Sequence, residues 1–214
     1  MTSIEEARAA LRQGGIIAIL RGDFAVDDML RLGEALLAGG VTLLEVTLNS
    51  AAALDALPQL RQRLGHGMLI GAGTVRYGTQ VQPALDAGAQ FLVSPNFDPD
   101  TVARARMAGL LHLPGIFTPS EAQTAFTAGC TVLKLFPADT VGPAYLKALR
   151  APLDDIEFVP TGGINLENIA AYRRAGAVAV GLGSQLVAGR QQASDELTAR
   201  AKALRAAWEA AGRG

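Results

Sequence analysis

Short apolar runs recur along the chain, and stretches with helical periodicity separate them. The eight runs cover residues 16–20, 43–48, 68–71, 91–93, 110–113, 131–136, 156–160 and 178–182. In the first intervening stretch, 26–38, the apolar residues lie along one broad face of a helix. Strands that alternate with helices pair in parallel, because a parallel connection needs a crossover of about a dozen residues. The pattern therefore predicts eight parallel strands with helices between them.

Glycines and capping residues mark where the predicted helices end and begin. Ala-Gly pairs precede five of the strands, at 38–39, 87–88, 108–109, 128–129 and 175–176. Glycine just past a helix accepts the left-handed backbone that stops it. At the other end of a helix, Thr118-Pro119-Ser120-Glu121 is a capping box with proline at the first helical position. Weaker helix starts lie at Gly142-Pro143 and Asn165. These matching ends and starts indicate a repeated unit.

Eight strand–helix units in about 190 residues predict an α/β fold of the (β/α)8 TIM-barrel type, with extra terminal helices over 3–13 and 192–211. No linker or low-complexity segment divides the chain, so we expect one domain over residues 1–214. An open doubly wound sheet is the alternative. Its dinucleotide-binding fingerprint is missing, because arginine ends the stretch 71–76 where a third glycine belongs.

Composition argues against several classes of partner. Nineteen basic and twenty acidic side chains give a net charge of −1, so we expect no general electrostatic surface for nucleic acid. Residues 1–12 lack the basic start and apolar centre of a signal peptide, and no run approaches the ~20 apolar residues of a membrane span. The single cysteine, Cys130, fits a core position in a reducing compartment. The sequence thus predicts a cytoplasmic protein without membrane or nucleic-acid partners.

Lys134 stands in the middle of the sixth apolar run. A parallel strand covered by helices is buried on both faces, and lysine is almost never fully buried unless another group pairs with it or uses it. A desolvated amine loses proton affinity and becomes a nucleophile that can form a Schiff base. The alternative is a lysine on an edge strand whose ammonium group reaches solvent.

Glu45 is a second charge within an apolar run, where an ionised carboxylate is costly unless it is paired. One explanation is a structural ion pair with Lys134. The other is an amine nucleophile with its general acid and base, which carbonyl chemistry requires. Two opposite charges on two separate interior strands favour the second explanation. Burial must then lower the pKa of the amine more than the neighbouring carboxylate raises it.

The active site of such a barrel lies at the carboxyl ends of the strands. Polar or wall-forming residues follow the first six strands there, namely Arg21, Thr47, Asn49, Thr74, Ser94-Pro95-Asn96, Pro114 and Phe136-Pro137. The loops after the last two strands, 161–165 and 181–184, are rich in glycine. Glycine lets backbone N–H groups approach an anion, and these loops form the recurrent phosphate site of this fold. We therefore expect a small phosphorylated substrate.

These segments together resemble the 2-keto-3-deoxy-6-phosphogluconate (KDPG) and 4-hydroxy-2-oxoglutarate aldolase family, which includes phosphogalactonate relatives. The resemblance covers residues from about 17 to 186 and is carried by Leu44-Glu45-Val46-Thr47-Leu48, Gly71-Ala72-Gly73-Thr74-Val75, Phe91-Leu92-Val93-Ser94-Pro95, Leu133-Lys134-Leu135-Phe136-Pro137-Ala138 and Pro160-Thr161-Gly162-Gly163-Ile164. It implies a class I aldolase on an eight-stranded barrel, usually trimeric, that needs no metal and no cofactor. We accordingly expect a homotrimer.

The resemblance also assigns roles to residues. It implies that Lys134 forms the Schiff base and that Glu45 moves protons. The expected reaction splits KDPG, a phosphorylated 2-keto acid, into pyruvate and glyceraldehyde 3-phosphate, and 4-hydroxy-2-oxoglutarate is a further candidate substrate. The resemblance also implies that Arg21 and Thr74 contact the pyruvate half of the substrate and that Pro95 and Phe136 form walls of the pocket. It implies a phosphate site made of Gly162, Gly163, Gly183 and Ser184.

Two further candidate substrate contacts leave the substrate epimer open. Asn49 stands where phosphogluconate enzymes usually carry arginine, and Asn49-Ser50 resembles the phosphogalactonate branch, as does the stretch 19–22. Thr161 instead resembles the phosphogluconate branch. Arg21 would then supply the guanidinium that position 49 lacks, since arginine can donate two hydrogen bonds to a carboxylate.

Two other kinds of function remain open from the sequence. One is a sugar-phosphate epimerase or isomerase in which Lys134 acts only through its charge. The other is a non-catalytic barrel that binds a phosphorylated metabolite. Of the two histidines, we expect His66 to be solvated and His112 to lie in the core or the pocket wall, and no metal-ligand spacing is present. We expect Trp208 to pack on the barrel or on a neighbouring subunit.

Overall fold

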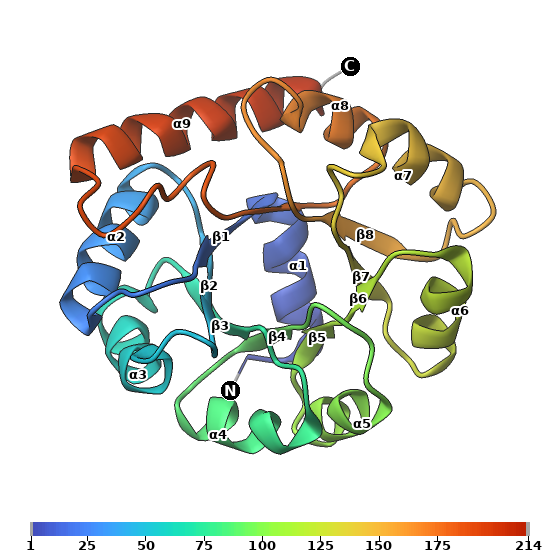
Figure 1. Ribbon diagram of the computed structural model, residues 1–214, viewed down its shortest axis with the longest axis horizontal. Coiled ribbons are helices and arrows are strands. Elements are labelled where there is room, and N and C mark those ends of the chain that lie inside the picture. The colour runs from blue at the N-terminus through green and yellow to red at the C-terminus, as the bar shows by residue number, and fades with distance from the viewer. Residues whose placement is uncertain (1, 213–214) are drawn as a thin grey trace.

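The computed structural model describes residues 2–212, with parallel strands around the centre and helices outside them (Figure 1). The strands are β1 (Ile16–Leu20), β2 (Leu43–Thr47), β3 (Leu69–Gly73), β4 (Phe91–Val93), β5 (Leu111–Leu113), β6 (Gly115–Ile116), β7 (Val132–Leu135), β8 (Glu157–Pro160) and β9 (Val180–Leu182). The helices are α1 (Ile4–Gly14), α2 (Val26–Ala38), α3 (Ala53–Leu64), α4 (Val81–Asp86), α5 (Pro99–Met107), α6 (Pro119–Thr127), α7 (Gly142–Arg150), α8 (Ile169–Arg174) and α9 (Ser194–Ala211), with a 3₁₀ turn at Gly78–Gln80.

The strands form two parallel sheets, which confirms the predicted α/β class. A curled six-stranded sheet has the order β5-β4-β3-β2-β1-β9, and a three-stranded sheet has the order β6-β7-β8. The two sheets face each other across the centre of the molecule (Figure 1). They meet at both borders: Thr161, just after β8, forms an isolated bridge with Gly181 of β9, and the Lys134 N–H donates to the Pro114 carbonyl at 2.9 Å.

All eight predicted strands are present, each within two residues of its predicted ends. The pattern does not predict β6, because Pro114 interrupts the apolar run. Proline has no N–H to donate to a strand ladder, so it ends β5, and the two residues after it pair with β7 instead. The sheet is therefore divided at the position of this proline.

Four of the five predicted glycine stops have left-handed backbone: Gly88, Gly109, Gly129 and Gly176. The prediction for Gly39 is wrong. Its φ is −83°, and the next residue, Gly40, takes the left-handed conformation with φ of 83°. Gly39 is needed for a different reason, since a Cβ at this position would overlap the Cβ of Ala201 in α9.

Arginine side chains of α5 and α9 cover the ends of two other helices. Arg106 of α5 donates to the Ala128 carbonyl at the end of α6, with N–O distance 2.8 Å, and Arg205 of α9 donates to the Gly14 carbonyl at the end of α1. A positive charge at a helix C-terminus interacts favourably with the helix dipole and its unpaired carbonyls. Each of these contacts therefore fixes one helix against another.

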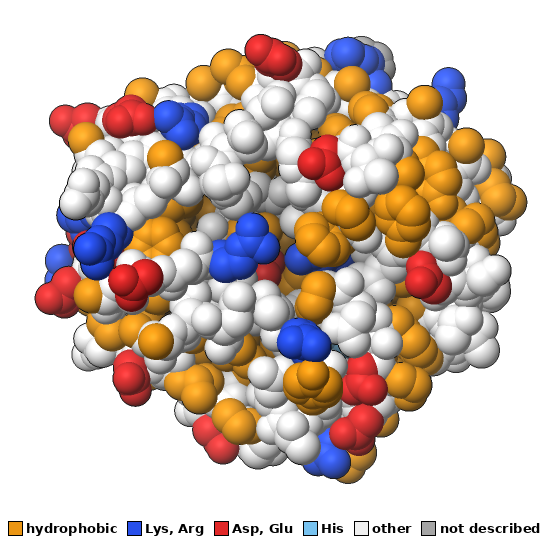
Figure 2. All heavy atoms as spheres, in the orientation of Figure 1, with side chains coloured by type: hydrophobic (Ala, Val, Ile, Leu, Met, Phe, Trp, Pro, Cys, Tyr) orange, Lys and Arg blue, Asp and Glu red, His pale blue; other side chains and the backbone are white. Residues whose placement is uncertain are grey.

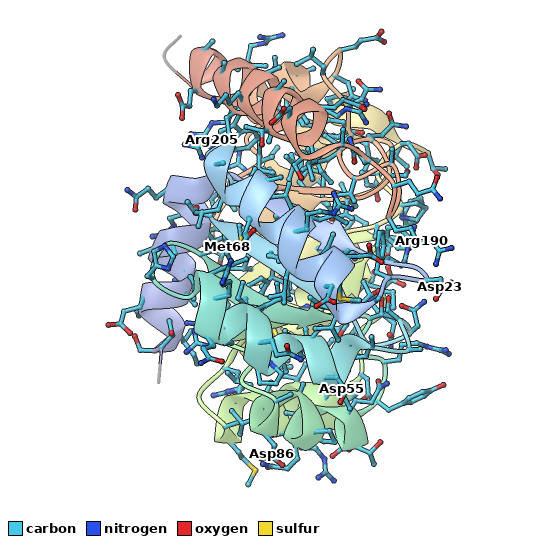
Figure 3. All side chains as sticks on the ribbon, turned by 90° about the vertical axis from the view of Figure 1, so that its left-hand side faces the viewer. Asp23, Asp55, Met68, Asp86, Arg190 and Arg205 are labelled. Carbon is cyan, nitrogen blue, oxygen red and sulfur yellow. The ribbon has the colours of Figure 1, made fainter. Side chains whose placement is uncertain are left out.

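Helix α1 covers one end of the strands. Ala7 and Leu11 pack against inward-facing strand residues, among them Ile17, Leu43 and Val159. In Figure 3, α1 lies at the side opposite Asp23 and Arg190, which follow β1 and β9. The amino ends of the strands are therefore closed, and the carboxyl ends remain open for a site.

Both predicted terminal helices are present, as α1 and α9, within two residues of their expected bounds. Trp208 of α9 is buried within its own chain, where Arg173 stacks on its ring at 4.6 Å and Gly15 lies against the indole.

Cys130 is a core residue, as predicted, and burial raises its thiol pKa to about 11. In residues 2–212, no helix combines the length and hydropathy that crossing a membrane requires.

A partly buried charge cluster holds α1 against β8. The guanidinium groups of Arg8 and Arg12 lie 2.7 Å and 2.5 Å from the carboxylate of Glu157. We expect Glu157→Gln to lower the free energy of unfolding by ~1–2 kcal/mol, because Arg8 and Glu157 are largely shielded from water. Urea titration measures this. Glu196→Gln, which breaks an exposed pair with Arg200, is the control and should cost less than ~0.5 kcal/mol; equal losses would contradict the expectation.

Candidate active site

A cavity of about 240 Å³ opens at the carboxyl ends of the strands. In Figure 2, basic side chains and one acidic side chain gather around a hollow in the middle of this face. The lining residues are Ile19, Arg21, Glu45, Thr47, Asn49, Thr74, Pro95, Lys134, Phe136, Thr161, Gly162, Gly163, Ile164, Gly181, Gly183, Ser184 and Gln185. Every residue to which the family resemblance assigns a role lies on the wall of this one cavity, as does Thr47, whereas Ser94, Asn96, Pro114 and Pro137 do not line it.

Two lining residues were not among the sequence candidates. Ile19 lies on β1, where residues two apart share a face, so its spacing from Arg21 could have placed it on the same wall. Gln185 follows Ser184 in the loop after β9, and nothing in the local sequence distinguishes it from an ordinary solvent-exposed residue.

Lys134 lies in the central strand of the shorter sheet and is only 7% exposed. The structure therefore excludes the alternative of an edge-strand lysine that reaches solvent. Its Nζ lies 5.1 Å from the centroid of the Phe136 ring. Burial lowers the pKa of Lys134, and the positive charge of Arg21 lowers it further. The negative charge of Glu45 raises the pKa but does not cancel these effects, so the pKa lies below its usual value. The amine is consequently neutral at a lower pH than that of a solvated lysine.

Glu45 lies in the middle of β2 and is 2% exposed. Burial raises the pKa of Glu45, and the charges of Lys134 and Arg21 only partly counteract this. Gly73 on the neighbouring strand makes room for the carboxylate, because a Cβ there would overlap it. Across the described part of the chain, no ion pair of 4.0 Å or less joins Lys134 to Glu45. The two groups thus face one cavity without forming the tight pair that a purely structural role requires.

Thr74 has a φ of 56° and is the one non-glycine residue in the left-handed region within residues 2–212. A β-branched residue in this conformation is strained by about 1–3 kcal/mol. Such strain persists only where surrounding contacts hold the backbone, and it concentrates at functional sites. The conformation turns the chain at the end of β3 and places Thr74 on the cavity wall.

The loops after β8 and β9 lie side by side at one end of the cavity, because the Thr161–Gly181 bridge joins them. Gly162 and Gly163 have φ values of 100° and 67°, which only glycine adopts readily. Gly181 lacks a side chain for a steric reason, since a Cβ there would overlap the Thr161 hydroxyl. This end of the cavity offers backbone amides and hydroxyl groups to an anion rather than further cationic side chains.

Arg21 lies at the mouth of the cavity and is exposed. Among the described residues, Arg21 and Lys134 are the two cationic side chains that line the cavity. Nearby, Asp23 and Arg190 form an exposed ion pair at 3.6 Å that joins the loops after β1 and β9 (Figure 3). Asn49 is also exposed at the rim. Among the residues that the structure describes, no carboxylate lies within 4.0 Å of the Arg21 guanidinium, so this group suits an anionic substrate.

Neither histidine lies in the cavity. His66 is exposed, and His112 is buried behind the wall, where burial lowers its pKa to about 4; both placements confirm the predictions. Within residues 2–212, no three His, Cys, Asp or Glu side chains gather as a set of metal ligands. The chemistry available to the cavity residues themselves is that of an amine, a carboxylate and hydrogen-bond donors.

Comparisons with known proteins agree with this geometry. A model of the KDPG and KHG aldolase family matches residues 7–202. The 2-dehydro-3-deoxy-phosphogluconate aldolase of Treponema pallidum is 40% identical over 173 residues, which are 80% of each protein. A solved structure described as native KDPGal superposes with a TM-score of 0.88 at 36% identity, covering 93% of this chain and 96% of that one. A KDPG aldolase from Legionella pneumophila, solved with pyruvate captured as a covalent carbinolamine intermediate, gives a TM-score of 0.83 at 31% identity, covering 92% and 96%.

Proposed function

The chain belongs to the KDPG and KHG aldolase family and is a carbon–carbon lyase; we propose that it cleaves 2-keto-3-deoxy-6-phosphogluconate to pyruvate and glyceraldehyde 3-phosphate through a Schiff base at Lys134. One observation carries the proposal. A buried lysine of lowered pKa and a buried carboxylate face the same cavity without pairing. That arrangement supplies a nucleophile and a proton carrier on opposite strands.

The proposed reaction begins when the neutral Lys134 amine attacks the ketone carbon of the keto acid. Loss of water from the carbinolamine gives an iminium ion, which can accept an electron pair. Glu45, directly or through a water molecule, takes the proton of the hydroxyl group as the adjacent carbon–carbon bond breaks. The electron pair of that bond enters the iminium and forms an enamine, and glyceraldehyde 3-phosphate leaves. Protonation and hydrolysis then release pyruvate and restore the amine.

The cavity wall supports a binding mode in which the carboxylate and the phosphate of the substrate lie at different ends of the cavity. Arg21 and Thr74 would contact the carboxylate end, with Pro95 and Phe136 as walls beside the reacting carbon. Asn49 and Thr161 would contact the hydroxyl-bearing middle of the substrate. The phosphate would then lie against the paired loops, bound by Gly162, Gly163, Gly183 and Ser184. With Asn at position 49, Arg21 is the guanidinium available for the carboxylate.

The corresponding phosphogalactonate is the alternative substrate. Asn49 lies at the rim where phosphogluconate enzymes usually carry arginine, and the similarity to the KDPGal structure points the same way. Thr161, in contrast, supports the phosphogluconate. Turnover of the two 6-phosphate epimers and of 4-hydroxy-2-oxoglutarate, measured side by side, decides between them. A kcat/KM for the galactonate epimer above that for the gluconate epimer would reverse the assignment.

Trapping with pyruvate and borohydride tests the reaction itself. The chain has three lysines, Lys134, Lys147 and Lys202, so peptide mapping locates a reduced adduct unambiguously. We expect a pyruvyl adduct on Lys134 alone. An epimerase or isomerase would turn over a sugar phosphate without this adduct, and a binding barrel would be stabilised by its ligand without turnover. Either result would overturn the proposal.

Ser184→Ala should separate phosphate binding from the remainder of the site. The Ser184 hydroxyl lines the phosphate end, and a hydrogen bond to a charged group contributes enough to change KM by about tenfold. We therefore expect KM for KDPG to rise by about tenfold while KM for unphosphorylated 4-hydroxy-2-oxoglutarate changes by less than about twofold. Steady-state kinetics with both substrates measures this, and equal losses would remove the phosphate site from this end.

Larger-scale features belong to the same proposal. The contacts at both sheet borders support a closed (β/α)8 barrel in which β5 and β6 act as one strand, and we propose that residues 1–214 form this single domain. The family resemblance supports a homotrimer located in the cytoplasm, with phosphorylated 2-keto acids and pyruvate as its small-molecule partners. Light scattering of the purified protein measures the oligomeric state.

A further inference from the structure

A buried chain of hydrogen bonds lies behind the cavity wall, outside the set of lining residues. His112 of β5 lies with its Nε2 2.7 Å from the Oγ of Ser94, the residue that follows β4. Ser94 in turn donates its hydroxyl proton to the carbonyl of Val75, with O–O distance 2.5 Å. All three residues are buried, with exposures of 5%, 1% and 0%. These two hydrogen bonds therefore connect the strand pair β4–β5 to Val75, the residue directly after Thr74.

The direction of these hydrogen bonds follows from the atoms available. Ser94 has one hydroxyl proton and gives it to Val75, so the Ser94 oxygen must accept a proton from Nε2 of His112. His112 is accordingly protonated on Nε2, and burial, which lowers its pKa to about 4, keeps the ring neutral. Its Nδ1 is then a bare acceptor, and it has no partner within residues 2–212. A leucine here would leave no polar atom unpaired, so His112 costs stability that only its bond to Ser94 offsets.

The chain of bonds acts on the most strained backbone of the site. Val75 is held at both of its polar groups: its N–H donates to the Val93 carbonyl at 3.1 Å, and its carbonyl accepts from Ser94. On the other side of Thr74, the Gly73 carbonyl accepts from the Leu48 N–H at 2.8 Å. Thr74 lies between these two fixed residues, which hold its backbone in the left-handed conformation observed there.

We propose that His112 and Ser94 are positioning residues of the reaction, which fix the Val75 carbonyl and thereby hold the Thr74 side chain against the substrate. Ser94 has a second route to the site, because it directly precedes Pro95 of the cavity wall. The inference rests on the proposed function, since Thr74 has a substrate to contact only if the keto acid reacts at Lys134. It assigns a role to two residues that touch neither substrate nor reacting atoms.

The first test compares His112→Leu with His112→Gln. Leucine removes the donor, and we expect kcat to fall by about 10- to 100-fold, because small displacements of a positioning group cost this much. KM for the phosphorylated substrate should change by less than about threefold, since the phosphate loops are untouched. Glutamine can place an amide N–H near the position of Nε2 and should restore kcat to within about threefold of wild type. Failure of glutamine to rescue a folded protein would overturn the proposal.

A second test asks whether the effect passes through Thr74. Glycine adopts a φ near 56° without strain, so Thr74→Gly removes the need for a clamp on this backbone. In a Thr74→Gly background, His112→Leu should lower kcat by less than about twofold. An unchanged 10- to 100-fold loss in that background would show that His112 acts by another route, and would overturn the proposal.

Control variants keep the test interpretable. Thr198→Val removes a partly buried hydrogen bond between α9 and α2, away from the cavity, and should leave kcat within about twofold of wild type. Should His112→Leu fail to fold, Ser94→Ala and Ser94→Thr provide the same comparison of loss and rescue. Borohydride trapping of the wild-type enzyme with pyruvate separates the two hypotheses. No adduct on Lys134 overturns the proposed function and this inference together, whereas an adduct combined with a fully active His112→Leu overturns this inference alone.

Discussion

Replacing Lys134 by alanine is expected to lower kcat for KDPG cleavage by about 10⁵-fold or more, because the variant cannot form the covalent iminium through which the carbon–carbon bond breaks. Steady-state assays with a coupled detection of pyruvate measure this loss. Lys147→Ala, at an exposed position of α7, is the matched control and should retain wild-type turnover. Turnover by Lys134→Ala within tenfold of wild type would show that the bond breaks without a Schiff base.

The stability of the same variant distinguishes a reactive amine from a structural ion pair. If Lys134 and Glu45 were a buried structural pair, removing the lysine would cost ~3–5 kcal/mol of folding free energy. The depressed pKa of Lys134 predicts the opposite. A lysine whose pKa is lower in the folded state than in the unfolded state destabilises the fold at every pH below its unfolded pKa, and the penalty vanishes only above that value. We therefore expect Lys134→Ala to unfold at an equal or higher urea concentration than wild type at neutral pH.

Glu45→Gln is expected to lower kcat by about 10²- to 10⁴-fold while leaving the lysine able to bind pyruvate. The amide keeps the shape of the side chain but cannot accept the hydroxyl proton during bond cleavage. Single-turnover cleavage of KDPG, measured beside borohydride trapping of pyruvate, separates the two steps. Glu34→Gln, on the exposed face of α2, is the control. Cleavage by Glu45→Gln at the wild-type rate would remove Glu45 from the proton transfer.

The same substitution should move the pH dependence of adduct formation in a defined direction. Attack requires the neutral amine, so the rate rises with pH through the pKa of Lys134 and levels off above it. The negative charge of Glu45 raises that pKa. Removing the charge should therefore shift the rising limb to lower pH. The initial rate of trapping, measured across pH for the wild-type protein and for Glu45→Gln, gives the rising part of each pH–rate curve. A shift of this rising part to higher pH in Glu45→Gln would contradict the electrostatic explanation.

Much of the fold was readable because its signals are local and repeated. The eight apolar runs, the capping box at Thr118 and four of the glycine stops correspond to observed strands and helix ends. Lys134 and Glu45 were recognisable for a related reason, since a charge inside an apolar run is conspicuous without knowledge of the fold. Burial of both residues is confirmed, and their roles in the reaction stay a prediction.

The features that the sequence did not reveal depend on contacts between distant segments. The conformation of Thr74 is held by hydrogen bonds that Leu48, Val93 and Ser94 make to the residues on either side of it, so nothing beside it in the chain predicts a positive φ. The sequence predicts a backbone role for Gly39, whereas its small size is required by Ala201, far away in the sequence. The His112–Ser94 bond likewise joins adjacent strands whose register only the folded chain defines. Such pairs form only when distant segments fold together, so the residues beside each member do not reveal them.

The contact between α9 and the start of the molecule has a consequence for how the protein is made. Arg205 and Trp208 secure the junction between α1 and β1, and β1 leads directly to Arg21 at the cavity mouth. The ribosome synthesises these two residues after all the described strands, whereas the junction that they secure precedes the first of those strands. A nascent chain therefore holds β1 without this cover until α9 has been made. We expect the binding site to reach its mature shape only after α9 has left the ribosome.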